Sequence, residues 1–225
     1  MRLLLISDEE DRYLWDFYKP GCLDGVDLIL SAGDLKAEYL SFLVTLSNRP
    51  LLYVHGNHDG SYDHTPPEGC ECVDDRLVTV KGLRILGLGG SMCYNGGKYQ
   101  YTEAQMQRRI RKLGRALRRA GGVDLVLTHA PAAGLGDDTD LAHHGFEAFL
   151  PLLDRWQPAY LVHGHVHRRY RPSGPRVLQY GSTSIINASG KSHITGNDTI
   201  RPYNIYTRKM AAGTGCEYPD RKSVV

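Results

Sequence analysis

Metal-binding side chains directly follow five short apolar runs of this sequence. The residues at these five places are Asp8, Asp34, Asn57-His58-Asp59, His129 and His165-Val166-His167. Runs of this length and composition are typical of strands that are buried on both faces of a sheet. Because ligands gather at the carboxyl ends of parallel strands, we expect these side chains to converge on one place with the chemistry of a metal site.

The donor atoms offered at the strand ends are nitrogen and oxygen, without thiolate. Such a set suits Mn, Fe, Zn or Mg in an open site of high coordination number. Six or seven ligands are too many for one catalytic metal that must leave room for water, so the set predicts two metals bridged by a carboxylate. A metal pair of this kind clamps both the attacking and the leaving oxygen of a phosphoryl displacement.

Local spacing supports this prediction. In His165-Val166-His167 a period of two places both imidazoles on one face of an extended segment, so that each could reach a different metal. Gly56 and Gly164 precede the ligand motifs. We expect these glycines to let the backbone pass close to the site without a side chain in the way.

The order of these motifs resembles that of calcineurin-like metallophosphoesterases, in particular the small, bacterial-type, phosphodiesterase-like branch. The matching motifs are Asp8-Glu9-Glu10, Gly33-Asp34, Gly56-Asn57-His58-Asp59, His129 and Gly164-His165-Val166-His167. The resemblance covers residues 2–188 and implies an α/β fold, a four-layer α-β-β-α sandwich of two mixed β-sheets flanked by helices. We therefore expect one domain over residues 1–188 and a tail of unassigned role over 189–225.

The resemblance also implies roles for individual residues. Asp34 would bridge two divalent ions, Mn or Fe in the first place and Mg or Zn as alternatives. The first metal would take Asp8 and His167, and the second would take Asn57, His129 and His165. His58 would protonate the leaving oxygen after attack by a metal-bridging hydroxide. The implied activity is hydrolysis of a phosphodiester or a small phosphomonoester.

The first motif departs from the family pattern, because Glu10 stands where the family usually has His. In one reading Glu10 is a metal ligand, and its harder oxygen favours Mn or Mg over Zn. In the other reading Glu10 points away and the first metal is weak or absent. The sequence favours ligation, since a carboxylate at this position beside Asp8 has an obvious role.

The substrate side of the site depends on loops. His143 and His144 are candidates for contact with a phosphate or leaving group, and Tyr94 is a candidate for the wall of the substrate site. His55 and His163 lie inside strands and are expected to pack against neighbouring residues rather than to reach the substrate.

The rest of the chain predicts alternating strands and helices. Helices are expected over 12–18, 38–46, 102–120 and 143–155, a hairpin over 77–88, loops over 60–75 and 89–101, and late strands over 177–180 and 184–187. The 102–120 helix combines an apolar stripe with a basic face formed by Arg108, Arg111, Lys112, Arg115, Arg118 and Arg119.

Composition narrows the function classes. The 225 residues suit one domain, and a net charge of +2 indicates no particular partner. No apolar stretch is long enough to span a membrane and no signal-peptide pattern follows Met1, so we expect a cytoplasmic protein with a small phosphoester substrate and no membrane partner. The spacing of Cys70-Glu71-Cys72 is too tight for a usual zinc pair.

Two functions remain as alternatives to a phosphoesterase. One is a catalytically weak scaffold with this fold that binds other proteins, and the other is a nuclease or nucleic-acid binder that uses the basic helix.

Overall fold

The computed structural model describes residues 1–167 and 175–195, and it contains two mixed β-sheets. In the first sheet the strand order is β13-β1-β2-β3-β4. Four of its strands run parallel, and β13 pairs antiparallel with β1 at the edge. The bounds are β1 Arg2–Ser7, β2 Leu28–Ser31, β3 Leu51–Tyr53, β4 Glu71–Cys72 and β13 Gly190–Thr195.

The second sheet has the strand order β11-β12-β10-β9-β6-β5. Its four inner strands are parallel, and an antiparallel strand lies at each edge. The bounds are β5 Arg76–Val80, β6 Leu83–Leu88, β9 Leu125–Thr128, β10 Tyr160–His163, β11 Val177–Tyr180 and β12 Thr183–Asn187. Two short strands, β7 Ser91–Met92 and β8 Gln100–Tyr101, pair with each other outside these sheets.

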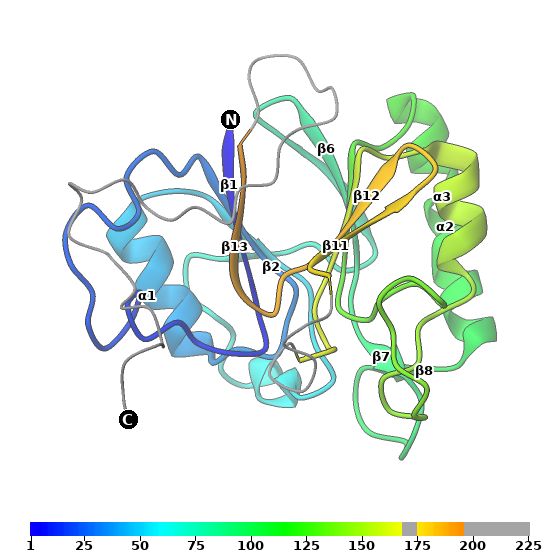
Figure 1. Cartoon of the computed structure of the whole chain (residues 1–225), viewed down its shortest axis with the longest axis horizontal. Coiled ribbons are helices and arrows are strands. Elements are labelled where there is room, and N and C mark those ends of the chain that lie inside the picture. Colours follow the sequence, from blue (N-terminus) through cyan, green and yellow to red (C-terminus); the bar gives the residue numbers. More distant parts are fainter. Residues whose placement is uncertain (168–174, 196–225) are drawn as a thin grey trace.

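The helices form the outer layers of the molecule. Helix α1 (Ala37–Ser47) covers the first sheet, while α2 (Glu103–Ala120) and α3 (Phe149–Trp156) cover the second. Figure 1 shows the two sheets facing each other in the middle, with α1 on one side and α2 and α3 on the other. The predicted four-layer α-β-β-α sandwich is thereby confirmed.

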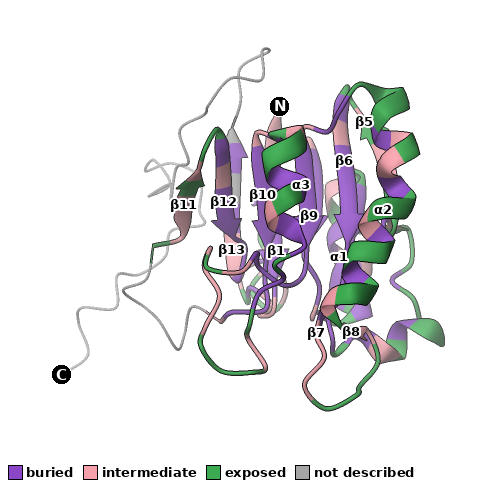
Figure 2. Ribbon diagram, turned by 90° about the vertical axis from the view of Figure 1, so that its right-hand side faces the viewer, coloured by how far each residue is buried: buried purple, intermediate pink, exposed green. Residues whose placement is uncertain are grey.

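The period of two in the strands decides which layer each side chain joins. In β1, Leu3 and Leu5 pack between the two sheets with residues such as Leu125 and Val162. The alternate residues of β1, Leu4 and Ile6, pack instead beneath α1. Both faces of the central strands are therefore buried, as the continuous apolar runs predict (Figure 2).

Helix α2 agrees closely with the sequence prediction. Thr102 caps it through a reciprocal capping box with Gln105, and Gly121 ends it in the left-handed conformation. Met106, Leu113 and Leu117 are buried against the second sheet. The predicted basic face is exposed, as the outward surface of α2 in Figure 2 shows.

Two predicted helices differ from the structure. Residues 12–18 form turns, because this short segment packs the Trp15 ring against Tyr39 and Phe42 of α1. The helix expected over 143–155 begins only at Phe149. The residues before Phe149 do not join the helix, because Phe146 forms a β-bridge with Ala132 and donates its N–H to the carbonyl of Pro131.

Some predicted loops contain short regular elements. The expected loop over 60–75 contains most of the 3₁₀ helix η1 (Asp59–Asp63) and the strand β4, and the expected loop over 89–101 contains β7 and β8. The start of the expected tail contributes β13, whereas residues 196–225 lie outside the described part of the chain. No helix among the described residues is long and apolar enough to cross a membrane.

Candidate metal centre

Three of the predicted ligands have a left-handed backbone, which is uncommon for residues other than glycine. The φ angles are 64° at Asp8, 57° at Asp34 and 66° at His165. Each residue follows a buried strand, so the chain turns sharply just where the strand ends. Strained conformations of this kind persist where surrounding contacts over-determine them, and they cluster at functional sites.

Side chains from both sheets meet at the carboxyl ends of the parallel strands. Asp34, His129 and His165 each present one donor atom, and the three atoms lie within 4.8 Å of one another. Nε2 of His129 lies 3.3 Å from Oδ2 of Asp34 and 2.9 Å from Oδ1 of Asn57. The structure therefore brings together four of the seven predicted metal ligands around Asp34.

Backbone carbonyls orient both imidazoles. Nδ1 of His129 donates to the Ala32 carbonyl at 2.7 Å, so Nε2 faces the carboxylate of Asp34. Nε2 of His165 donates a hydrogen bond to the Ala142 carbonyl at 2.6 Å, which leaves Nδ1 as the ring nitrogen that can bind a metal. Metal-bound histidines in proteins are commonly fixed by a hydrogen bond at the other ring nitrogen.

Asp8 carries a buried oxygen that lacks a hydrogen bond. Its Oδ1 accepts the backbone N–H of His165 at 2.9 Å, whereas Oδ2 is buried and has no hydrogen-bond partner among the residues that the structure describes. Burial raises the pKa of this carboxyl. A buried oxygen without a donor is costly, and a cation would satisfy it. This orphaned atom, beside a nitrogen and oxygen donor set, fits the divalent metals that the sequence predicts.

Glycines make room for the carboxylates, as the sequence predicts. A Cβ atom on Gly56 would overlap the carboxylate of Asp34. A Cβ atom on Gly164 would overlap the hydroxyl of Ser7 and would lie 2.8 Å from Oδ2 of Asp8. Both positions thus require a residue without a side chain.

The electrostatics of the centre favour positive charge between the carboxylates. Burial opposes ionisation of Asp34, but the charge and hydrogen bond of His129 outweigh it and lower the pKa of Asp34 to about 2. Burial likewise opposes protonation of His129, yet the charge of Asp34 raises its pKa to about 9. Burial, and then the charge of His129, lower the pKa of His165 to about 3, while the charge of Asp34 offsets this only in part.

Comparison with known proteins agrees with this geometry. The model of the family described as calcineurin-like phosphoesterase matches residues 2–169. The chain belongs to this family. Members typically bind divalent metals, and the donor groups described above could hold them. The family also includes members without catalytic activity, so membership by itself suggests a phosphoesterase but does not identify a substrate.

Two individual proteins illustrate the relationship. The UPF0046 protein K07C11.7 of Caenorhabditis elegans is 26% identical over an alignment of 222 residues. The match covers 84% of this chain and 69% of the relative. The crystal structure of TT1561 of Thermus thermophilus superposes with a TM-score of 0.58 at 15% identity, covering 84% of this chain and 89% of that one. The second similarity supports the fold alone.

The first motif of this calcineurin-like phosphoesterase chain does not extend the cluster. The Glu10 carboxylate accepts the backbone N–H of Lys36 at 3.2 Å and lies 4.0 Å from its Nζ. Nδ1 of His167 lies 3.8 Å from the carboxylate of Glu9. Neither Glu10 nor His167 belongs to the group around Asp34. The position of Glu10 fits the reading in which it points away, and its role as a ligand stays a prediction.

The predicted general acid, His58, is exposed at the mouth of the centre. Its backbone N–H donates to Oδ1 of Asp34 at 2.8 Å, so its position is tied directly to the predicted bridging residue. Tyr94 also reaches the centre, because its hydroxyl accepts a hydrogen bond from Nδ2 of Asn57 at 3.1 Å. That bond leaves Oδ1 of Asn57 directed toward His129.

The two candidate substrate histidines lie differently. The ring of His143 is 5.2 Å from that of His165, and its Nδ1 is 2.9 Å from the carboxylate of Asp140. His144 instead has Nδ1 3.8 Å from Asp137. His143 therefore lies beside the centre, while His144 is placed by a different carboxylate, and substrate contact stays a prediction for both.

The sequence indicated no specific role for Asp59, whose carboxylate holds the backbone of two loops that carry predicted ligands. Its Oδ2 accepts the backbone N–H of Gly56 at 2.7 Å and that of Asp34 at 2.9 Å. Burial, and then the charge of Asp34, raise the pKa of Asp59 to about 6. This carboxylate ties the two ligand loops together, and its place in the Gly-Asn-His-Asp motif was the signal that could have revealed it.

Proposed function

We propose that this chain is a dinuclear metal-dependent phosphoesterase that hydrolyses a phosphodiester or a small phosphomonoester. The observation that carries the proposal is the convergence of His129, His165 and Asn57 on Asp34, close to a strand end where Asp8 keeps a buried oxygen without a partner. Membership of the calcineurin-like phosphoesterase family supports the reaction class.

In this proposal Asp34 would be shared by two divalent ions, with Mn or Fe preferred over Mg or Zn. Asp8 and His167 would hold the first ion, and Asn57, His129 and His165 would hold the second. When bound, the pair would polarise the phosphate and activate water for attack. The carbonyls of Ala32 and Ala142 keep the imidazole donor atoms aimed at the centre.

His58 donates a proton to the leaving oxygen of the substrate. Its imidazole is exposed, and the hydrogen bond from its backbone N–H to Asp34 anchors the backbone of His58 beside the centre. Proton transfer by a positioned side chain typically contributes about 10²–10⁴-fold in rate. The contribution is largest when the leaving group is a poor one.

The test compares leaving groups. Protein loaded with Mn²⁺ should hydrolyse a nitrophenyl phosphodiester or phosphomonoester, and Asn57→Ala should remove most of that rate. His58→Ala should lose little rate on the nitrophenyl ester and about 10²-fold or more on an alkyl ester. Lys36→Ala is the control, since its side chain is largely exposed beside Glu10. Absence of hydrolysis over a broad ester panel, with two metals bound per chain, would contradict the proposal.

A catalytically weak scaffold is the second candidate, and the orientation of Glu10 is the observation that favours it. If the first metal were lost with that ligand, the fold would remain without turnover. Elemental analysis separates the two, because about two metals per chain support the enzyme and none supports the scaffold.

A further inference from the structure

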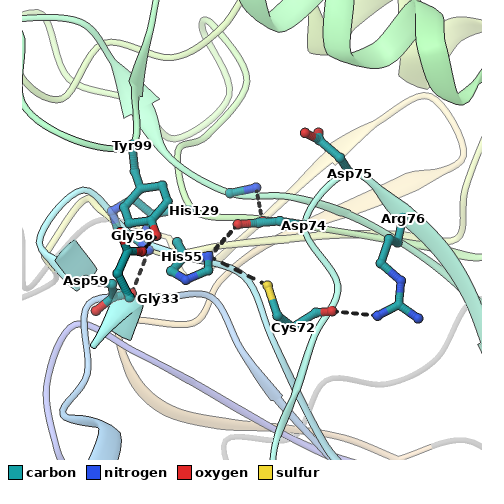
Figure 3. A network of polar contacts seen from close by, with 12 residues as sticks. Gly33, His55, Gly56, Asp59, Cys72, Asp74, Asp75, Arg76, Tyr99 and His129 are labelled. Atoms are coloured by element: carbon teal, nitrogen blue, oxygen red, sulfur yellow. Dashed lines mark hydrogen bonds and ion pairs between the residues drawn. The ribbon is translucent and has the colours of Figure 1, made fainter. Parts of the chain in front are cut away.

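A second cluster of potential metal donors lies next to the centre but shares no residue with it. His55 follows β3, Cys72 ends β4, and Asp74 follows two residues later. One donor atom from each of the three lies within 4.8 Å of the others. Figure 3 shows contacts from the His55 ring to both Asp74 and Cys72, with Gly56 and the ring of Tyr99 nearby.

The three donors point at a common place. Nδ1 of His55 lies 2.7 Å from Oδ2 of Asp74 and 3.7 Å from Sγ of Cys72. The same ring nitrogen therefore faces both the carboxylate and the thiol. In a tetrahedral zinc site with bond lengths of about 2.0–2.3 Å, donor atoms are separated by roughly 3–4 Å. The distance from Nδ1 of His55 to the Cys72 thiol fits this range as it stands, while the His55–Asp74 pair must open slightly.

Surrounding contacts hold these side chains in position. Oδ1 of Asp74 accepts the backbone N–H of Gly89 at 2.7 Å. The imidazole of His55 stacks on the ring of Tyr99 with centroids 4.3 Å apart and planes at 16°. The side chains of His55 and Asp74 are only 13% and 17% exposed. The donors are thus preorganised and sheltered, yet not sealed from solvent.

We propose that His55, Cys72 and Asp74 form a separate site for a thiophilic divalent ion, Zn²⁺ by preference, with the fourth position taken by water. A ligand set of one thiolate, one imidazole and one carboxylate selects softer ions than the nitrogen and oxygen donors around Asp34. On binding, the Cys72 thiol and Nδ1 of His55, which donates its proton to Asp74 in the metal-free chain, each release a proton to solvent, and Nε2 of His55 keeps its own proton.

The site would stabilise the loop that carries the predicted catalytic residues. His55 is separated from Asn57 by Gly56 alone, and the carbonyl of His55 accepts the N–H of Gly90 at 2.7 Å. An ion that joins the end of β3 to the segment after β4 would therefore restrain the Gly56–Asp59 turn. Its role in this site is structural, and it does not depend on phosphoester hydrolysis.

Cobalt substitution tests the site through a signal specific to thiolate coordination. With thiols kept reduced, the full chain titrated with Co²⁺ should develop a near-ultraviolet sulfur-to-cobalt charge-transfer band. Cys72→Ser should abolish the band, because serine offers no sulfur. Asp74→Asn should weaken Co²⁺ binding by at least the roughly 10–100-fold that loss of an outer-shell partner costs, because it alters a direct ligand.

Cys70→Ser is the matched control, since the Cys70 thiol lies two residues away and is 3.5 Å from the Glu68 carbonyl. This variant should keep the band at full intensity. Circular dichroism and thermal unfolding establish that each variant is folded. The proposal is overturned if the parent chain shows no band at saturating Co²⁺, or if folded Cys72→Ser retains it. Either result leaves the phosphoesterase proposal untouched, because the predicted ligands of the centre around Asp34 include no thiolate.

Discussion

Nε2 of His129 lies 3.3 Å from Oδ2 of Asp34, while Nδ1 of the same ring donates to the Ala32 carbonyl at 2.7 Å. Two strands of different sheets, β2 and β9, thus place a carboxylate and an imidazole in contact at the common end of the sandwich. Because the carbonyl can accept only from a protonated Nδ1, the atom available to a metal is Nε2.

Metal binding at this pair should release a proton. Burial disfavours the charged imidazole, but the Asp34 charge raises the pKa of His129 to about 9 in the metal-free chain. Below that pH a proton occupies Nε2 and competes with the ion, so apparent Mn²⁺ affinity should rise as pH increases toward 9. Calorimetry in two buffers of different ionisation enthalpy should report about one proton released at pH 7. An affinity independent of pH between 6 and 9 would contradict this assignment.

Glu10→Ala should leave the metal content nearly unchanged. The Glu10 carboxylate accepts the backbone N–H of Lys36 rather than joining the group around Asp34. Asp8→Asn is the matched comparison and should lower the metal content, because it removes charge from the buried, unpartnered oxygen. Elemental analysis of both variants decides the matter. Equal metal loss in the two would show that Glu10 is a ligand, as the sequence favours.

Gly56→Ala should damage the centre, because the new methyl group would overlap the Asp34 carboxylate. Overpacking of this kind typically costs about 1–3 kcal/mol, and the displaced carboxylate should weaken metal binding. Gly60→Ala is the control, since its Cβ would meet nothing nearer than the Lys98 side chain at 3.8 Å. Thermal unfolding and metal titration measure both effects. A Gly56→Ala variant as stable and as well loaded as Gly60→Ala would refute the close approach.

Acid stability should depend in part on Asp124. Burial alone would raise the pKa of this carboxyl, but it is lowered from 3.8 because Asp124 accepts hydrogen bonds from the backbone and the guanidinium of Arg84. A lowered folded-state pKa gives stabilisation that is complete above about pH 4 and is lost as the pH falls through the folded value. Asp124→Asn should cost about 1–3 kcal/mol at pH 7.

The cost of Asp124→Asn should shrink as the pH falls below about 4, because the parent carboxyl then becomes protonated as well. Denaturant unfolding of metal-free protein over the pH series measures this difference. Asp27→Asn, which alters a more exposed carboxylate with a lowered pKa, shows how much of any pH effect is general to such groups. A cost that stays constant down to pH 2 would contradict the assignment.

Much of the fold could be predicted because the strands are buried on both faces. The side chains of Leu3 to Ile6 alternate between the core between the two sheets and the core beneath α1. All four residues must therefore be apolar, and the sequence shows them as one continuous apolar run. Helix α2 was equally visible, since its stop and its Thr102 cap are local signals. The segment 12–18 could not be assigned correctly, because contacts of Trp15 with α1 outweigh its weak local preference for a helix.

By itself the sequence determined which donor types stand at which strand ends, and parallel pairing within each sheet places those ends side by side. Packing of the two sheets against each other then brings Asp34, Asn57, His129 and His165 together. Only the tertiary structure decided where Glu10 turns, because that depends on the backbone of Lys36 across the loop. It also decided the environment of Cys72, which in sequence stands only beside Cys70. Pairing of β3 with β4 places its thiol next to His55, seventeen residues earlier in the chain, a contact that no local spacing encodes.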